Sequence, residues 1–229
     1  MSNDFSDTAA LLSDPARAAM LLSLMDGRSL PAGQLALIAR IAPQTASSHL
    51  AKLVNGHLLA VECQGRHRYY RLANIHVAHA IESVLAIMPR PRVPSIPKPP
   101  RAAAGLDFAR TCYSHLAGRL AVEISDAFKQ RRLLLRDGPK RYKLTRSGRD
   151  WFETFGIAIS PSQAANSRFA YPCLDWTERR HHIAGNLGAA LLKRLTELRW
   201  IVPVPDSRAV RVTVTGREQL ARLLDIQTQ

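Results

Sequence analysis

The chain has 229 residues, of which 46% are hydrophobic, so it is long enough for two modest domains with apolar cores. Its formal net charge of +14 predicts a polyanionic partner such as nucleic acid, although a basic surface kept for solubility is the alternative. Three widely spaced cysteines argue against a disulfide framework, and the sequence shows no signal peptide and no apolar run of membrane-spanning length. We therefore expect a cytoplasmic protein with no membrane partner.

Apolar residues at helical spacing predict three helices early in the chain, over residues 15–26, 30–38 and 43–55. Pro43 suits the first turn of the third helix, and Gly56 is expected to supply the positive φ that ends it. The third helix buries one stripe, made of Ala46, Leu50 and Leu53. Its opposite face is polar.

Two strands, over residues 58–62 and 68–72, are predicted around a turn at Gln64-Gly65. Helix, turn, second helix and hairpin together make a winged helix-turn-helix, whose second helix enters the DNA major groove. Base contacts are expected chiefly from Gln44, Thr45 and Ser48, and phosphate or minor-groove contacts chiefly from Lys52, Arg66 and Arg68. The complete predicted DNA-binding set is Gln44, Thr45, Ser47, Ser48, His49, Lys52, Arg66, His67 and Arg68.

Three segments, SDPAR at 13–17, SSHLAKL at 47–53 and GRHRYYRL at 65–72, resemble the ArsR/SmtB family of bacterial transcription regulators. The resemblance covers residues 5 to 88. It implies a homodimeric repressor that leaves its operator when a ligand binds, with a last helix, here predicted over 75–88, packing across the dimer axis. The residues after 100 exceed what the small one-domain members have.

The metal sites that the family implies find little match in this first domain. Residues 31–38 lack the cysteine pair of the arsenic- and cadmium-responsive members. His76, His79 and Glu82 follow one another at i, i+3 and i+6 on the last helix, where zinc-responsive relatives carry histidine and carboxylate ligands. The spacing departs from theirs, so a solvated polar face is the alternative.

Residues 89–100 hold six of the fourteen prolines, which predicts an extended, semi-rigid spacer. We expect a winged helix-turn-helix and dimerisation domain over 1–88, a basic linker over 89–105, and an effector or oligomerisation domain over 106–229. The linker's basic residues could contact phosphates, although a linker that simply exposes its charges is the alternative.

An internal repeat marks the second half of the chain. HLAG at 115–118 recurs as HIAG at 182–185, and LTRSGR at 144–149 recurs as VTVTGR at 212–217, offsets of 67 and 68 residues. We predict two helix–hairpin–helix halves related by a pseudo-twofold axis, giving an α+β fold that is mainly α with small β-hairpins. The predicted long helices cover residues 113–131 and 179–198, and the predicted caps of the closing helices are Ser147 and Thr215. A basic hairpin offers a second DNA surface through Lys140, Arg141 and Lys143.

Each half has a cysteine upstream of its histidine: Cys112 precedes His115, and Cys173 precedes His182. If the halves pack pseudo-symmetrically, these groups could meet and bind a soft metal or metalloid, or react with an oxidant. Two buried cysteines packing as small hydrophobes are the alternative. The predicted effector residues are Cys112, His115, Cys173, Trp176 and His182. The metal, if one binds, is unknown, and its candidate ligands are Cys112, Cys173, His76, His79 and Glu82. No cofactor is expected to be required.

Aromatic residues offer a different effector site, for a small molecule. Segment 171–182 together with Trp151, Phe152 and Phe155 could line an apolar pocket, or these rings could form the core.

An enzyme is not expected. Cys173, Asp175 and His182 have the residue types of a nucleophile, an orienter and a base, but the chain contains no nucleophile elbow, phosphate-binding glycine loop, zinc-binding His-Glu-x-x-His or dinucleotide fingerprint. Two hypotheses remain: a sequence-specific repressor released by an effector, and an architectural nucleic-acid binder without sequence preference or effector. The second predicts equal binding to any duplex with a steep salt dependence.

Overall fold

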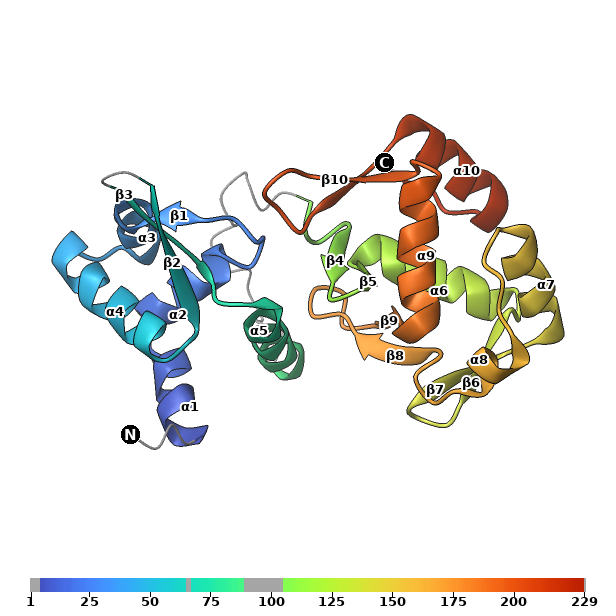
Figure 1. Cartoon of the computed structure of the whole chain (residues 1–229), viewed down its shortest axis with the longest axis horizontal. Helices are drawn as coiled ribbons and strands as arrows, with labels where there is room; N and C mark the ends of the chain where they lie inside the picture. Colours follow the sequence, from blue (N-terminus) through green and yellow to red (C-terminus); the bar gives the residue numbers. More distant parts are fainter. Residues whose placement is uncertain (1–4, 65–66, 89–104, 229) are drawn as a thin grey trace. The chain divides into compact units, whose positions relative to one another are not determined.

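The computed structural model in Figure 1 describes residues 5–64, 67–88 and 105–228, and the chain divides into two compact units. The first unit extends to Ile81, and the second contains Glu82–Met88, Gly105–Val204 and the residues from Arg208 onward. The predicted linker and Arg66 lie outside the described residues, except for Gly105 at the linker's end. None of the helices in the described ranges has the length and apolar character that crossing a bilayer requires.

The first unit is a winged helix-turn-helix with a three-stranded antiparallel sheet in the order β1-β3-β2. Its elements are α1 (Phe5–Ser13), α2 (Pro15–Ser23), β1 (Leu30–Pro31), α3 (Ala32–Ala39), α4 (Pro43–Asn55), β2 (Leu59–Gln64), β3 (His67–Leu72) and α5 (Ile75–Ile87), whose residues from Glu82 on belong to the second unit. The helix predicted over 30–38 starts two residues late, because Leu30 and Pro31 pair with Tyr70 and Tyr69 of the wing.

Helix α4 has the bounds that the apolar spacing predicts, and its stripe of Ala46, Leu50 and Leu53 is buried. Its end differs from the expectation, since Gly56 has a φ of −83° and His57 is the positive-φ residue at +58°. A Cβ at Gly56 would lie 2.2 Å from Leu11 Cδ1, so the end of that leucine side chain would have to shift to admit a larger residue.

In the second unit, each half runs hairpin, helix, hairpin, helix (Figure 1). The first half contains β4 (Arg110–Cys112), β5 (His115–Ala117), α6 (Arg119–Gln130), β6 (Leu134–Asp137), β7 (Arg141–Leu144), α7 (Arg146–Thr154) and the short α8 (Pro161–Ala165). The second contains β8 (Tyr171–Leu174), β9 (His181–Ala184), α9 (Gly185–Glu197), β10 (Ile201–Pro203), β11 (Val210–Val212) and α10 (Val214–Leu224).

The long helices predicted over 113–131 and 179–198 are therefore wrong at their starts, where β5 and β9 lie. The strands end at Gly118 and Gly185, whose φ values of +88° and +84° separate each strand from the helix after it. A Cβ at Gly118 would lie 2.8 Å from Phe108 O, and one at Gly185 would lie 2.5 Å from Arg168 O.

The closing helices of the two halves begin in the same way. Thr145 caps α7 by accepting a hydrogen bond from Gly148 N–H at 2.9 Å, and Thr213 caps α10 by accepting one from Gly216 N–H at 2.9 Å. The predicted caps, Ser147 and Thr215, are wrong by two residues, because they lie inside the first helical turn.

Each first hairpin packs on the helix of the other half: β5 lies against α9, β9 lies against α6, and β5 and β9 are neighbours. The buried hydroxyl of Ser125 on α6 accepts a hydrogen bond from Ile183 N–H of β9 at 3.1 Å. Because each first hairpin packs against the other half, residues 112–115 and 173–182 lie in the same region of the unit.

Of the aromatic residues considered for a ligand pocket, Phe152 lies in the hydrophobic core of this unit and Trp151 and Phe155 pack against that core, whereas Tyr171 is exposed. Phe128 packs edge-on against Trp151 and Phe152, and Trp151 stacks on Phe155 with ring centroids 5.0 Å apart. The core alternative is therefore the one that the packing supports.

Candidate functional site

The exposed face of α4 carries the polar side chains that the sequence analysis assigned to DNA. Gln44, Thr45, Ser47, Ser48 and Lys52 are all exposed, on the side of the helix away from its buried stripe. This arrangement follows from the helical spacing itself, because burying Ala46, Leu50 and Leu53 turns the intervening polar residues outward.

His49 differs from its neighbours. Its ring is half-buried, and its Nδ1 lies 3.3 Å from Arg17 Nη1 and 3.7 Å from Asp14 Oδ1 of the α2 cap. The contacts hold α4 against the start of α2. A hydrogen bond from Arg17 N–H keeps the pKa of Asp14 below its usual value.

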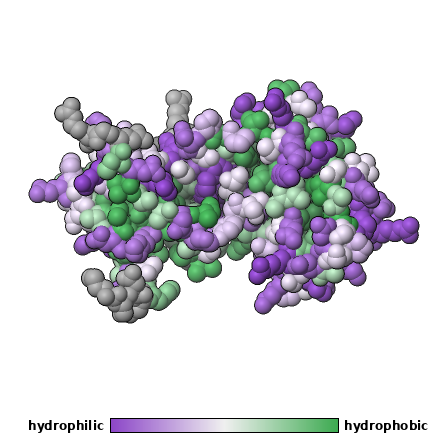
Figure 2. Space-filling view, viewed as in Figure 1, coloured by the Kyte–Doolittle hydropathy of each residue, from purple (hydrophilic) through white to green (hydrophobic). Residues whose placement is uncertain are grey.

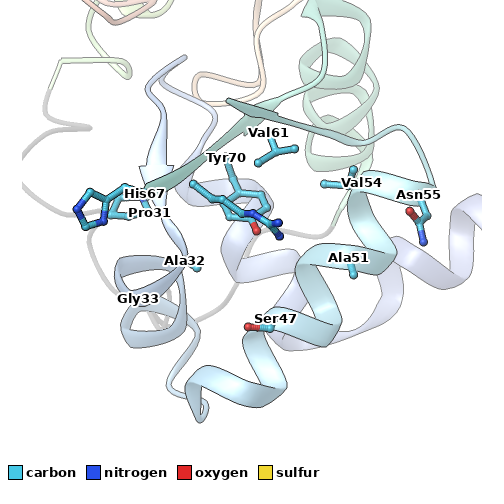
Figure 3. Close-up of a pocket in the computed structure, with 11 residues that line it drawn as sticks. Pro31, Ala32, Gly33, Ser47, Ala51, Val54, Asn55, Val61, His67 and Tyr70 are labelled. Carbon is cyan, nitrogen blue, oxygen red and sulfur yellow. The ribbon is translucent and has the colours of Figure 1, made fainter. Parts of the chain in front are cut away.

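The wing completes this face. His67 and Arg68 are exposed on β3, whereas Arg71 is paired with Glu62 across the hairpin at 2.5 Å. A groove of about 530 Å³ lies between the wing and α4 and is lined by Ser47 and Ala51 on the helix side (Figure 3). None of the described residues that line it is acidic, so no side chain of this lining would repel a negatively charged strand.

In the second unit, four of the predicted effector residues form one cluster: Cys112, His115, Cys173 and His182. One ligand atom from each lies within 4.8 Å of the others, and the two imidazole Nε2 atoms are 3.1 Å apart. Cys112, His115 and His182 are buried and Cys173 is half-buried.

Strand register explains why these side chains meet. Cys112 pairs with His115 across the β4–β5 hairpin, and Cys173 pairs with His182 across β8–β9. Each hairpin thus presents one cysteine beside one histidine. His181, the residue before His182 on β9, is exposed.

Asp175 lies directly behind His182. The carboxylate is completely buried, and its Oδ2 is 3.4 Å from His182 Nδ1. The same oxygen accepts hydrogen bonds from Gly118 N–H at 2.7 Å and from the buried Arg110 guanidinium at 3.0 Å, while Oδ1 accepts from Thr177. Burial opposes ionisation, but the bonds from His182, Arg110, Thr177 and Gly118 outweigh it and hold the pKa of Asp175 well below its usual value.

The ionisation of the cluster is shifted by its own members. A hydrogen bond with Cys112 lowers the pKa of the Cys173 thiol, against the effect of burial. Burial lowers the pKa of His182, but hydrogen bonds to Asp175 and Cys112 raise it overall. The Cys173 thiol therefore favours its thiolate form, and the His182 ring favours its protonated form.

Other candidate residues have different environments. Glu82 is buried in the second unit, where it accepts hydrogen bonds from Arg208 at 3.0 Å and from the Cys112 thiol at 3.5 Å and lies 3.7 Å from Arg110. Its partners are thus two arginines of the protein and one thiol of the cluster. His76 is exposed and His79 is half-buried on α5. Trp176 lies under the Arg110 guanidinium, 5.2 Å from its ring centroid.

Sequence reasoning missed the importance of Arg110, and it considered Asp175 only as a catalytic orienter. Both are fully buried and pair with each other across 65 residues of sequence. Arg110 is the first residue of β4, and its local sequence does not identify the partner.

The basic hairpin β6–β7 is exposed at Lys140, Arg141 and Lys143, although Arg141 is paired with Asp137. It lies at an edge of the second unit that is largely hydrophilic in the view of Figure 2. A second DNA surface at this hairpin stays a prediction.

Comparison with known proteins finds a relative that matches along the full length of the chain. The chain is 44% identical over 227 residues to the HTH-type transcriptional regulator YdfF of Bacillus subtilis, covering 99% of this chain and 100% of YdfF. It is 34% identical over 77 residues to the HTH-type transcriptional regulator CmtR of Mycobacterium tuberculosis, covering 34% of this chain and 64% of CmtR. No family model matches the chain.

Two solved structures are similar to part of the chain. The NMR structure of the cadmium metal-sensor CMTR from Mycobacterium tuberculosis has a TM-score of 0.32 and 27% identity, covering 41% of this chain and 99% of that one. The crystal structure of the transcriptional repressor BigR from Xylella fastidiosa has a TM-score of 0.35 and 21% identity, covering 39% and 91%.

The full-length relative and the motifs of the first unit indicate the same class of protein. YdfF is named as a transcriptional regulator, and it is matched along both units. The three motif segments lie on α2, α4 and the wing of the winged helix-turn-helix fold. This chain therefore belongs to the ArsR/SmtB family of winged helix-turn-helix transcriptional regulators, with an additional C-terminal domain.

Proposed function

We propose that this regulator is a homodimeric repressor that binds a specific operator and leaves it when an effector acts on the C-terminal domain. The observation that carries the proposal is the exposed polar face of α4 beside the basic wing and the groove between them. Gln44, Thr45 and Ser48 would contact bases, because their short polar side chains lie on the helix that enters the major groove.

Basic side chains on the same face would bind the DNA backbone. Lys52 on α4 and Arg68 on β3 are exposed and form no ion pair within the described part of the chain, and Arg66 is proposed for the same role from its place in the sequence between β2 and β3. Ser47 and His67 are proposed to support these contacts, and His49 to position α4 through its contacts with α2.

A homodimer would form through the end of α5. Val84, Ile87 and Met88 are apolar and exposed, Ile87 by 81%. Leaving such an apolar stripe exposed to water is unfavourable, and the same stripe of a second copy of the chain would cover it. A twofold dimer would then present two α4 helices to an inverted repeat.

The C-terminal domain is proposed to hold the effector site. We assign residues 1–88 to DNA binding and dimerisation, 89–105 to a linker and 106–229 to two copies of one repeat. The matched threonine caps and glycine turns support this repeat, and the Cys–His cluster supports an effector that binds or modifies thiols.

A fluorescence-anisotropy titration against the duplex upstream of the gene, with a scrambled duplex of equal length, tests the proposal at near-physiological salt. We expect a preference of about a thousandfold or more for the native duplex. Equal affinity for both, with a steep salt dependence, would support the architectural alternative instead.

Variants separate the two kinds of contact. Ser48→Ala should cost about 1–3 kcal/mol on the native duplex and little on the scrambled one, whereas Arg68→Ala should weaken both and reduce the salt slope. Lys193→Ala is the matched control, because this exposed lysine on α9 lies outside the proposed surface.

Dimerisation is tested separately by sedimentation. Ile87→Glu should shift the protein toward monomer and weaken operator binding. A variant that stays dimeric would refute the assigned interface.

A further inference from the structure

We infer that Cys112, His115, Cys173 and His182 form a four-coordinate site for one divalent metal ion of the zinc class. The inference assigns a chemical class to the proposed effector site. It rests on the proposed function only for its regulatory consequence, because metal binding can be measured without DNA.

The donor set selects the metal. Two thiolates and two imidazoles suit Zn²⁺, Co²⁺ and Cd²⁺, while Mg²⁺ and Ca²⁺ require oxygen ligands. Asp175 supplies no ligand in this group, because its carboxylate is already occupied by Arg110, Gly118 and Thr177. The site therefore offers four N and S donors.

The distances fit a tetrahedral ion. Two imidazole nitrogens bound to zinc at 2.0–2.1 Å in tetrahedral geometry lie about 3.3 Å from each other. The Nε2 atoms of His115 and His182 are 3.1 Å apart, with the rings tilted by 39°, and both sulfurs lie within 4.8 Å of the nitrogens. Small side-chain movements would complete the coordination.

Asp175 supports the metal by fixing the ring of His182. A carboxylate next to Nδ1 favours the proton on that nitrogen, which leaves the Nε2 lone pair directed at the cluster. Carboxylate–histidine–metal arrangements of this kind raise ligand basicity and orient the ring. Arg110 holds the carboxylate in place with its hydrogen bond at 3.0 Å.

The ion would join the two halves of the domain. Cys112 and His115 come from β4–β5, and Cys173 and His182 come from β8–β9, so each half supplies one thiolate and one imidazole. With all four positions filled by protein, no coordination site is left for a substrate, which is typical of structural or regulatory zinc and not of catalytic zinc.

The test uses the full chain, made metal-free with a chelator under reducing conditions and titrated with Co²⁺. We expect one Co²⁺ per chain with the ligand-field bands of tetrahedral cobalt and a thiolate-to-cobalt charge-transfer band, all lost when Zn²⁺ replaces it. The double variant Cys112→Ser/Cys173→Ser should lose the charge-transfer band, while Cys63→Ser and His181→Asn should keep it. An octahedral spectrum for the wild type, or a charge-transfer band retained by the double variant, would overturn the site.

Two further measurements distinguish loss of the metal site from misfolding of a variant. Zn²⁺ should raise the melting temperature of the wild type and of Cys63→Ser, followed by tryptophan fluorescence; no shift in either overturns the inference. Asp175→Asn should weaken Co²⁺ binding about 10–100-fold while keeping the tetrahedral spectrum. If metal binds as expected but operator affinity is unchanged, the metal site stands and its regulatory use fails.

Discussion

Asp175→Asn is the change that most sharply tests the packing of the C-terminal domain. The side chain is completely buried and accepts hydrogen bonds from the Arg110 guanidinium, from Gly118 N–H and from Thr177. Asparagine has the same shape, but it has no charge and one of its two oxygens is replaced by an NH₂ donor. Whichever way the amide is turned, one set of donors then faces another donor.

The loss of stability follows from the charge that stays buried without its partner. Arg110 is fully buried, and without the carboxylate its nearest acidic partner is Glu82, 3.7 Å away and already bonded to Arg208. Removing one partner of a buried ion pair costs roughly 3–5 kcal/mol, mostly because the other charge stays buried without compensation. We expect a loss of that size in the free energy of unfolding of the metal-free domain.

Tryptophan fluorescence measures this domain selectively, because the chain's three tryptophans, Trp151, Trp176 and Trp200, all lie in the second unit. Urea unfolding in the presence of a chelator should show a lower midpoint for Asp175→Asn with an unchanged slope. Asp150→Asn, at an exposed position on α7, is the control and should change stability by less than about 0.5 kcal/mol. A loss below about 1 kcal/mol for Asp175→Asn would refute the argument.

The pH dependence gives a second check on the same residue. Because the folded pKa of Asp175 is held below the unfolded value of about 3.9, its ionisation stabilises the fold above that pH. The stabilisation is lost as pH falls below about 4, toward the folded pKa. The wild type should therefore lose more stability on acidification than Asp175→Asn, and parallel acid limbs would contradict the assignment.

Three other substitutions test the remaining architecture. Leu50→Ala removes a fully buried side chain of α4. It should lower the free energy of unfolding by about 2–5 kcal/mol, followed by far-UV circular dichroism, and it should also weaken operator binding. Gly216→Ala places a Cβ 2.0 Å from Trp200 O and should lower the free energy of unfolding by about 1–3 kcal/mol, measured by urea unfolding followed by tryptophan fluorescence. Tyr113→Pro cannot adopt the φ of +60° at the β4–β5 turn, so it should abolish the tetrahedral Co²⁺ spectrum. A variant indistinguishable from wild type in its assay would contradict the corresponding contact.

The DNA-binding helix was predictable because its evidence is local. Ala46, Leu50 and Leu53 define a buried stripe within one helix, and that stripe alone fixes which residues of α4 face outward. His49 shows the limit of this reasoning. Its place on the helical wheel is near the polar face, but the cap of α2 lies close enough to bind its ring, and no pattern within α4 contains that information.

The hairpins at the start of each half were missed because Leu116 and Ile183 satisfy both periodicities. An apolar residue between His and Ala-Gly fits a helix as well as a strand, and only the positive φ of Gly118 and Gly185 separates the two. The glycines were visible in the repeat, where HLAG and HIAG share them. Their meaning as strand ends depends on the backbone of Phe108 and Arg168 approaching within van der Waals distance, which is a tertiary contact.

The Cys–His cluster shows how strand pairing can hide a symmetric site in the sequence. The cysteine lies three residues before its histidine in the first half and nine before it in the second, a mismatch that favoured two unrelated buried thiols. In a hairpin the distance between two side chains depends on register and not on the length of the connection. Cys112 faces His115 and Cys173 faces His182 as direct partners, and the six extra residues of the second hairpin form the turn that contains Asp175. The longer turn of the second hairpin therefore contains Asp175, whose carboxylate lies next to His182 Nδ1. The unequal spacing, which argued against a shared site, arises from the turn that supplies this supporting residue.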